Sequence, residues 1–583
     1  MIILTKLTLF FSCSILGMWF SSQWVASSFR YRVAILGEPL LSLGDLRIYK
    51  PWSLLPWMVQ WSGLYPAAFK IQVVPCLTGI GLGTFLAIWA SVWVRINKNG
   101  LTTHGSARWA SKKEIQTSGL LARDGVLLGL TYDKSRYLRH DGPEHICAFA
   151  PTRSGKGIGL VVPTLISWMG SVVCFDPKGE NWKLTSGFRN KLGRCIYFDP
   201  TSSKSARFNP MAEIRKGDCE VKDAQNIADM LVDPDGSQQH RSHWERTAHS
   251  LLVGVILHVV YVEQEKTLSG LAKFLSHPDR TFQETLSLML NTCHLGGRVH
   301  PVVASSAREL LNKAPEELSG VLSTAISFLS LYRDPLVARA TSCSDFKISD
   351  LVSDKRPVSL YLVVPPSDII RTKALMRLIL NQIGRVLTES FSLEPRPHRL
   401  LWLLDEFPAL GKLDFFESAL AYMAGYGMKC FLITQSLNQL DAIYGPNNSI
   451  LDNCHIKIAF ASNDERTARR ISDLLGQKTE LKQQKSISGN RLSGFMDHSS
   501  VSFQEFSRPL LMPSEIMQLS HKDEIVFVAG FPPILAQKLR YYEDPQLLER
   551  VLKSPPLEKT EAVVPIQDDP NQIKKQSLKE GWL

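Results

Sequence analysis

The sequence has few of the features that mark a metalloprotein or a disulfide-stabilised secreted domain. Its ten cysteines include no C-x-x-C pair, and its fourteen histidines include no H-E-x-x-H or other ligand spacing. Several cysteines lie in or beside apolar, strand-like runs and are expected to be buried thiols: Cys174, Cys195, Cys430 and Cys454. We therefore expect a protein of a reducing compartment, without disulfides or a structural metal.

Positive charge is also thinly spread along the chain. The net charge is +11 over 583 residues, and residues 1–70 account for +4 of it, with six basic against two acidic side chains. The sequence has no dense basic tract with interleaved aromatics, so charge alone does not indicate nucleic-acid binding. It also has no internal repeat. If DNA is bound, loops of several subunits would have to assemble the cationic surface, for example around residues 478–491.

Two long segments, 7–29 and 71–94, contain no charged residue. A helix crosses a bilayer with about 20 apolar residues, so both are long enough to span. The first contains serines and Gln23, and could instead be a signal peptide with Lys6 as its charged start. Aromatic residues that favour the membrane interface lie between the two segments: Trp52, Trp57, Trp61 and Tyr65. The sequence predicts a membrane anchor over residues 1–95, with two transmembrane helices and a short periplasmic loop.

Residues 150–157 (Ala-Pro-Thr-Arg-Ser-Gly-Lys-Gly) resemble a phosphate-binding loop between a strand and a helix. Gly155 would let backbone N–H groups converge on phosphate oxygens, and Lys156 would reach the outer phosphates. The loop departs from G-x-x-x-x-G-K-[ST] at Ala150 and at Gly157, where the hydroxyl that usually binds Mg²⁺ is missing. Another group or a water must take that place, or hydrolysis is slow. The expected nucleotide-binding residues are Thr152, Arg153, Ser154, Gly155, Lys156 and Gly157.

An apolar strand expected over residues 400–404 ends in two adjacent carboxylates, Asp405 and Glu406. Asp405 is placed to hold Mg²⁺, directly or through water, and Glu406 to orient or deprotonate the attacking water. A second expected strand ends at Gln435, which could sense the γ-phosphate, position water or cap the local backbone. We expect an ATPase that uses ATP and Mg²⁺, with four catalytic residues: Lys156, Asp405, Glu406 and Gln435.

An ATP site has to face the cytosol. With two spans, both termini and the ATPase domain then lie in the cytoplasm, and the loop between the spans lies outside. The protein is therefore expected to be a multi-pass protein of the bacterial inner membrane.

Short apolar runs that alternate with helical patterns predict an α/β fold with a mostly parallel sheet. Between about residues 213 and 345 strand patterns are absent, and three capping boxes begin at Ser242, Thr281 and Ser306. We interpret residues 213–345 as an all-α domain inserted into the nucleotide-binding domain.

The two parts of that nucleotide-binding domain are expected at 96–212 and 346–545. Within the second part, the polar segment 477–498 is expected to be a mobile insert or surface loop. Residues 546–583 are rich in Pro, Lys, Glu and Asp, which predicts a flexible tail.

The motifs and their order resemble the coupling proteins of type IV secretion systems, the TraG/TraD-like conjugative transfer ATPases. The matching stretches are 150–157, 176–180 (Asp-Pro-Lys-Gly-Glu), 208–210 (Phe-Asn-Pro), 404–411 (Leu-Asp-Glu-Phe-Pro-Ala-Leu-Gly), 435–439 (Gln-Ser-Leu-Asn-Gln) and 508–511 (Arg-Pro-Leu-Leu). A loop that ends in Gly-Lys-Gly is frequent in that family, so Gly157 fits the resemblance.

The resemblance implies a RecA-like P-loop NTPase domain with an inserted all-α domain, preceded by two transmembrane helices. It implies a homo-hexameric inner-membrane ATPase that recruits a relaxase–DNA complex, effector proteins or both. ATP hydrolysis would drive delivery of this cargo, including single-stranded, relaxase-bound DNA, into the channel of the secretion system. The helical insertion would face the cytosol and help to select substrate, by docking a relaxase or an adaptor protein.

Other functions account for fewer of these features. A docking receptor that uses nucleotide mainly to assemble its hexamer is supported by Gly157 and opposed by Glu406. A chromosome-segregation DNA pump would carry more spans and a C-terminal winged helix, and a membrane-anchored kinase or transporter fits poorly. The sequence does not choose an arginine finger among Arg153, Arg377, Arg466, Arg469 and Arg470.

Overall fold

The structure, a computed structural model, describes residues 2–43, 46–98, 102–233, 236, 241–389, 396–488 and 498–557. The chain divides into two compact units. One unit contains Met1–Ser106 and Thr479–Ser507, and the other contains Ala107–Lys478 and Arg508–Leu583. Each unit is described by itself.

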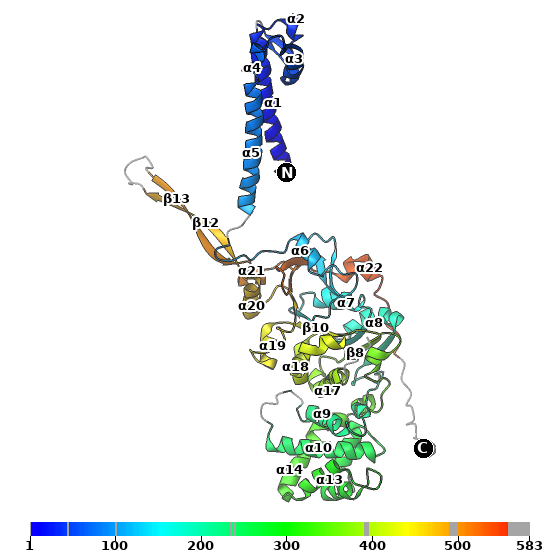
Figure 1. Cartoon of the computed structure of the whole chain (residues 1–583). Helices are drawn as coiled ribbons and strands as arrows, with labels where there is room; N and C mark the ends of the chain where they lie inside the picture. The colour runs from blue at the N-terminus through cyan, green and yellow to red at the C-terminus, as the bar shows by residue number, and fades with distance from the viewer. Residues whose placement is uncertain are drawn as a thin grey trace, which may run out of the picture. The chain divides into compact units, whose positions relative to one another are not determined.

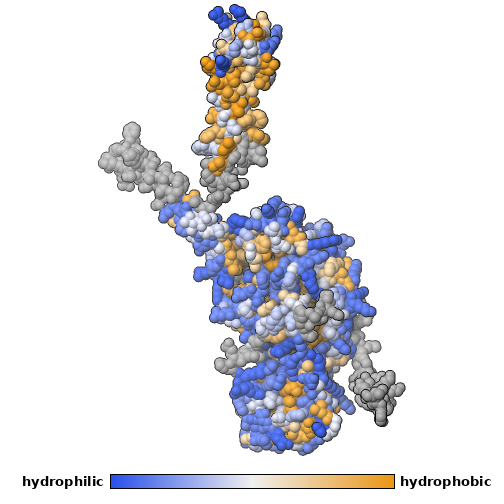
Figure 2. Space-filling model, viewed as in Figure 1, coloured by the Kyte–Doolittle hydropathy of each residue, from blue (hydrophilic) through white to orange (hydrophobic). Residues whose placement is uncertain are grey.

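The first unit is built on two long helices, α1 (Ile2–Ser28) and α5 (Val74–Lys98), which pack against each other along their length (Figure 1). Glycines let the backbones approach closely: a Cβ added at Gly79 would lie 2.6 Å from the Cys13 carbonyl oxygen. Figure 2 shows apolar residues along the outside of this helix pair. Among the described residues, one segment, Ala67–Ala90, is long and apolar enough by composition to cross a membrane.

A small cap joins the two long helices. Its elements are α2 (Val33–Leu36), β1 (Leu41–Leu43), β2 (Leu46–Ile48), η1 (Pro51–Ser53), α3 (Leu54–Trp61) and α4 (Ala67–Lys70). Aromatic side chains form its core, where Tyr49 packs edge-on against Trp57, and Phe29 packs against Phe69.

The polar segment expected to be a mobile insert or surface loop over 477–498 forms part of a hairpin instead. Strand β12 (Gln477–Ser488) pairs with β13 (His498–Pro509) in a two-stranded sheet of its own. The β12 sequence has no sustained alternation of apolar and polar residues, so the hydrophobic pattern did not reveal the strand. The remainder of the expected loop, 489–497, lies outside the described residues.

The second unit is organised around an eleven-stranded sheet with the strand order β4-β3-β15-β14-β11-β5-β10-β9-β6-β8-β7. Neighbours from β11 to β7 are parallel, and the pairs from β4 to β11 are antiparallel. The mostly parallel sheet is thereby confirmed, with an antiparallel part that the sequence did not predict. The strands are β3 (Val126–Thr131), β4 (Tyr137–His140), β5 (Ile146–Phe149), β6 (Ser171–Asp176), β7 (Arg194–Phe198), β8 (Val358–Val363), β9 (Leu400–Leu404), β10 (Met428–Thr434), β11 (Ile456–Ala459), β14 (Asp523–Val528) and β15 (Ile534–Gln537).

Both faces are buried along the central strands of the parallel part. Successive side chains of a strand point to opposite faces; in β5, Cys147 and Phe149 join one apolar core while Ile146 and Ala148 join the other. The continuous apolar runs of the sequence follow from this double burial.

Helices cover the two faces or extend from the ends of the strands. They are α6 (Lys112–Thr117), the π-helical turn η2 (Gly157–Val161), α7 (Val162–Leu165), α8 (Glu180–Leu192), α17 (Ile369–Glu389), η6 (Phe407–Leu410), α18 (Asp414–Met423), η7 (Ala424–Tyr426), α19 (Leu437–Tyr444), α20 (Glu465–Leu475), α21 (Pro513–Met517), η8 (Tyr541–Glu543) and α22 (Pro545–Leu548).

A run of helices separates β7 from β8, where the sequence predicts an all-α insertion. It contains η3 (Pro210–Glu213), α9 (Glu220–Val232), α10 (His243–Tyr261), α11 (Leu268–Leu275), α12 (Phe282–Asn291), α13 (Pro301–Leu311), α14 (Pro315–Phe328), η5 (Ser330–Arg333), α15 (Pro335–Ala340) and α16 (Asp350–Ser353). The capping boxes at Ser242 and Thr281 are confirmed. The box at Ser306 is wrong, because α13 already begins at Pro301 and Ser306 donates to the Ser250 carbonyl inside the helix packing.

The flexible tail expected from residue 546 is wrong for the first residues of that range, which pack against the rest of the unit. Residues 545–548 form α22, and Leu547 is buried. The backbone of residues 552–553 packs against Gly187, where an added Cβ would lie 2.3 Å from the Lys553 carbonyl oxygen. The rest of the expected tail, 558–583, lies outside the described residues.

Candidate nucleotide-binding site

The strand order brings the expected motif residues to one edge of the sheet. In the order β5-β10-β9-β6, the strands end within two residues of one another: Phe149 pairs with Thr434, and Leu404 pairs with both Leu432 and Phe175. The segments that follow these strands therefore leave the sheet side by side. Ligands of open α/β sheets bind at such carboxyl ends.

The expected phosphate-binding loop follows β5 and leads into η2. Gly155 has φ 91° and Arg153 has φ 60°, so two residues of the loop have a backbone in the left-handed region. Ala150 has no positive φ and its N–H donates to the Thr434 carbonyl over 2.9 Å, so alanine fits there without strain. A Cβ added at Gly157 would meet nothing within 4 Å. A lack of space therefore does not explain why this position has no serine or threonine.

Lys156 joins the loop to the carboxylates that follow β9. Its Nζ lies 3.0 Å from Asp405 Oδ1 and 2.6 Å from Glu406 Oε2. Burial works to lower the pKa of Lys156, but the two carboxylates outweigh it and the pKa is raised. Lys156 therefore stays protonated between the two carboxyl groups.

Gln435 completes this cluster from the end of β10. Its Nε2 donates to Glu406 Oε1 over 2.8 Å, while Glu406 itself adopts a left-handed φ of 72°. A non-glycine residue in that conformation is strained, and such strain gathers at functional sites. All four expected catalytic residues thus lie in one connected group; their catalytic roles remain predictions.

The structure adds Asn181, which the sequence did not single out. Asn181 is buried in the first turn of α8, and its Nδ2 lies 3.5 Å from Asp405 Oδ2. Its only signal in the sequence is its place directly after the stretch 176–180. Of that stretch, Asp176 is buried and accepts from the Trp182 N–H, whereas Lys178 and Glu180 are exposed. Burial, aided by the Asp405 charge, raises the pKa of Asp176 to about 6.

The arginines considered as a finger differ in their surroundings. Arg377 is fully buried in α17, where it donates to the carbonyls of Asp233 and Lys412. It therefore cannot reach into the site of a neighbouring subunit. Arg466 is bound to Asp441 at 2.8 Å and Arg469 to Glu465 at 3.0 Å. Arg153 and Arg470 are exposed.

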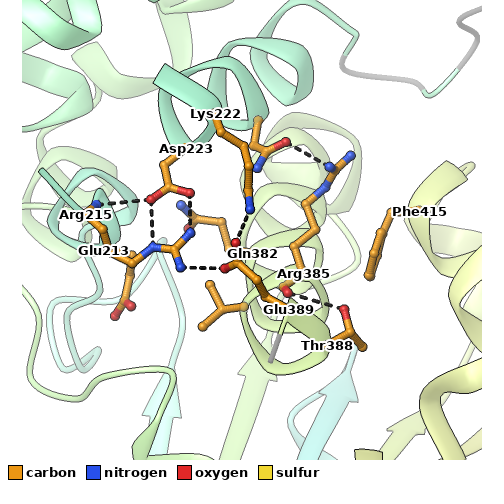
Figure 3. A pocket seen from close by; sticks show the side chains of 11 residues that line it. Glu213, Arg215, Lys222, Asp223, Gln382, Arg385, Thr388, Glu389 and Phe415 are labelled. Atoms are coloured by element: carbon orange, nitrogen blue, oxygen red, sulfur yellow. Dashed lines mark hydrogen bonds and ion pairs between the residues drawn. The ribbon is translucent and has the colours of Figure 1, made fainter. Parts of the chain in front are cut away.

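A separate pocket lies between the helical run and α17 (Figure 3). Arg215 binds Asp223 and Glu389 there, and Lys222 also binds Glu389. Arg385 donates to Asn226 Oδ1 over 2.8 Å. Since most of these groups bind one another, the pocket is a polar junction of two elements, and we assign it no ligand.

Comparison with known proteins agrees with the geometry. The family model for type IV secretory system conjugative DNA transfer matches residues 108–564. The conjugal transfer protein TraG of Escherichia coli is 42% identical over 581 residues, covering 91% of this chain and 90% of TraG. The VirD4 protein of Rhizobium radiobacter is 30% identical and covers 81% of this chain and 69% of VirD4.

A solved structure of the bacterial conjugative coupling protein TrwB, TrwBdeltaN70, has the same fold. It superimposes with a TM-score of 0.55 at 18% identity, covering 74% of this chain and 92% of TrwBdeltaN70. The expected α/β fold is confirmed by this likeness. By its family model and its relatives, the chain belongs to the conjugative DNA transfer family of type IV secretory systems, as a type IV coupling protein.

Proposed function

We propose that this coupling protein is an inner-membrane ATPase that recruits a relaxase–DNA complex, effector proteins or both. ATP hydrolysis would drive their delivery into a type IV secretion channel. The observation that carries the proposal is the contact of Lys156 with Asp405 and Glu406, with Gln435 on the far oxygen of Glu406. This group joins a phosphate-binding loop to a candidate base at one edge of the sheet.

The residues present fit ATP with Mg²⁺. Mg²⁺ at such sites takes one or two carboxylates and completes its shell with phosphate oxygens and water. Among the described residues no group of three or more His, Cys, Asp or Glu side chains could hold a metal by itself. Asp405 would hold Mg²⁺, directly or through water, with Asn181 bound to its second oxygen. When bound, Mg²⁺ would neutralise charge on the phosphates. Solved structures of TrwB in complex with ADP and Mg²⁺ and with an ATP analogue support this fit.

Different residues of the chain would then bind the phosphates and activate the water. The backbone N–H groups of residues 152–157 would bind the phosphates, and Lys156 would move from its carboxylates to the outer phosphate oxygens. That exchange would leave Glu406 Oε2 open to accept a proton from water, while Gln435 keeps Oε1 fixed. General-base help of this kind contributes about 10²- to 10⁴-fold.

We further propose that α1 and α5 both cross the membrane. Besides the span at Ala67–Ala90, α1 packs on α5 through Gly17, and a Cβ there would lie 2.5 Å from the Pro75 carbonyl oxygen. Large apolar side chains of α1 remain exposed, as those facing lipid would be: Leu7, Phe11, Ile15, Leu16, Phe20 and Trp24. Two spans would put both termini on the same side of the membrane, and the proposed use of ATP makes that side the cytoplasm.

The proposed division is an anchor at 1–95, a nucleotide-binding domain at 96–212 and 346–545, and a substrate-selecting helical domain at 213–345. A homo-hexamer is the proposed assembly. A docking receptor with little hydrolysis is the second candidate, because Gly157 removes the usual hydroxyl ligand of Mg²⁺.

The proposal is tested by Lys156→Ala in the full chain, scored for substrate transfer between cells and for membrane insertion. We expect transfer to be abolished while insertion is unchanged. Lys183→Ala is the matched control, because Lys183 is an exposed lysine on α8. Normal transfer by the Lys156→Ala protein would refute an ATP-driven mechanism.

A further inference from the structure

The antiparallel part of the sheet brings a second lysine to the phosphate-binding loop. Lys538 directly follows β15, and its Nζ donates to the carbonyl oxygen of Ser154 over 3.2 Å. The same ammonium group lies 3.7 Å from the centroid of the Phe460 ring, at the end of β11. An aromatic face attracts a cation at this distance, so the ring helps to hold the ammonium group in place.

The carbonyl that Lys538 holds belongs to the peptide unit of the Gly155 N–H. In a planar trans peptide the C=O and the N–H point in opposite directions. Fixing the Ser154 carbonyl on the side of Lys538 therefore fixes the Gly155 N–H on the other side. Gly155 has φ 91°, and a glycine is free to turn at this point, so the orientation of this peptide needs an external hold.

A cation bound to a carbonyl also strengthens the donor at the other end of the same peptide. Hydrogen bonds with a charged partner are stronger than neutral ones, and linked hydrogen bonds polarise one another. An N–H in this position is a better donor for a phosphate oxygen than one whose carbonyl faces water.

A buried carboxyl group also interacts electrostatically with Lys538. Glu524 on β14 is fully buried, and neither of its carboxylate oxygens has a hydrogen-bond partner in the described part of the chain. It fits only because residue 129 is glycine: a Cβ added at Gly129 would lie 1.7 Å from Glu524 Oε1. Burial raises the pKa of Glu524 to about 8; where this carboxyl is ionised, its charge favours the ammonium form of Lys538.

We propose that Lys538 is a positioning residue of the phosphate-binding loop, which holds the Ser154–Gly155 peptide so that the Gly155 N–H faces the phosphates. Nucleotide affinity then depends on the charge of a residue that lies outside every motif of the site. This inference rests on the proposed nucleotide site, and its test separates the two.

The charge of Lys538 changes in an accessible pH range. Burial lowers the pKa of Lys538 to about 8; the neighbouring Arg540 also lowers it, while Glu524 and Asp523 raise it. The ammonium form of Lys538 therefore prevails below about pH 8 and is lost as the pH rises further, while the ionisation of Glu524 in the same range opposes this loss. A purely structural lysine would give no such step in nucleotide affinity.

The test uses the full chain in lipid nanodiscs, with a fluorescent ATP analogue as the probe. The dissociation constant and kcat are measured from pH 6.5 to 9.5 for the wild type, Lys538→Met, Lys538→Arg and the control Lys522→Met. Lys522 is an exposed lysine close in sequence. We expect Lys538→Met to weaken binding about tenfold, roughly the effect of one charge-assisted hydrogen bond, with a smaller change in kcat. Lys538→Arg should restore most of the affinity.

The pH profile keeps the test decisive even if Lys538→Met fails to fold. Wild-type affinity should fall as pH rises through about 8, and the arginine variant should lack this fall because its charge persists. Equal affinity of wild type and Lys538→Met, or a flat wild-type profile in folded protein, would overturn the proposal. Binding that survives Lys156→Ala and all Lys538 variants would instead refute the nucleotide site itself.

Discussion

The parallel and antiparallel parts of the large sheet differ in the residues that they bring to the candidate nucleotide site. The parallel part, from β11 to β7, ends in the loop, carboxylates and amide that form the Lys156 cluster. The antiparallel part contributes no residue to that cluster, yet Lys538 reaches the back of the loop from it. Under our proposal, the parallel part carries the groups for chemistry and the antiparallel part holds the phosphate-binding loop in position. Substitutions in the parallel part should therefore damage turnover, whereas those in the antiparallel part should damage affinity or stability.

The largest effect is expected for Glu406→Gln in the parallel part. Losing the candidate base should reduce hydrolysis about 10²- to 10⁴-fold, while ATP binding stays within roughly threefold because the loop and Lys156 remain. Hydrolysis and binding are measured on the same nanodisc samples. Glu316→Gln, an exposed carboxylate in the helical run, is the control. Unchanged hydrolysis would remove Glu406 from the catalytic role.

Gly129→Ala should break the antiparallel part instead. The added Cβ would overlap Glu524 Oε1, and φ at Gly129 is 147°, so we expect a loss of about 2–4 kcal/mol in unfolding free energy. Gly119→Ala is the matched control, because Gly119 also has a positive φ but open space around its Cβ position. Thermal unfolding of both variants gives the comparison. Glu524→Ala should recover part of the loss, and equal loss in both glycine variants would contradict the close contact.

Gln435→Ala should have an intermediate effect on turnover. Its 2.8 Å hydrogen bond to Glu406 is charge-assisted and worth about 1.5–3 kcal/mol, so hydrolysis should fall about 10- to 100-fold with little change in affinity. Gln546→Ala, an exposed glutamine on α22, should behave as wild type. A change in the dissociation constant alone would assign Gln435 to binding instead.

The smallest effect is expected for Gly157→Ser, which sharpens the choice between motor and docking receptor. The serine side chain has room, since nothing lies within 4 Å of the Cβ position. In a working motor, hydrolysis should change by less than about threefold, and half-saturation by Mg²⁺ should move to lower concentration. If the missing hydroxyl is what prevents hydrolysis, Gly157→Ser should instead raise turnover more than about tenfold.

The central strands of the parallel part, β5, β6, β8, β9 and β10, could be predicted from the sequence because they are buried on both faces and read as mainly apolar runs. The polar residue that ends each run, such as Asp405 or Gln435, then marks the site directly. Lys538 could not be found in this way. It stands in no motif, and its partner Ser154 lies 384 positions away, so only the strand order brings them together.

Other differences have local causes. Ser306 and Glu309 have the spacing of a capping box, but Pro301 starts the helix five residues earlier. Composition alone predicts a tail from residue 546. In the structure, Leu547 packs in an apolar cluster with Leu127 of β3, and the backbone at Lys553 packs against Gly187 of α8. Asn181 has an amide beside Asp405 that follows from the geometry of α8 and from no sequence pattern.

The central claim, that this coupling protein is a motor driven by the Lys156 cluster, is tested most directly by ATP hydrolysis of the full chain in lipid nanodiscs. Turnover is measured with and without single-stranded DNA, with Lys156→Ala as the blank. We predict hydrolysis that DNA stimulates and that disappears in the blank. Nucleotide binding without turnover, in the presence and absence of DNA, would contradict the claim and favour the docking receptor.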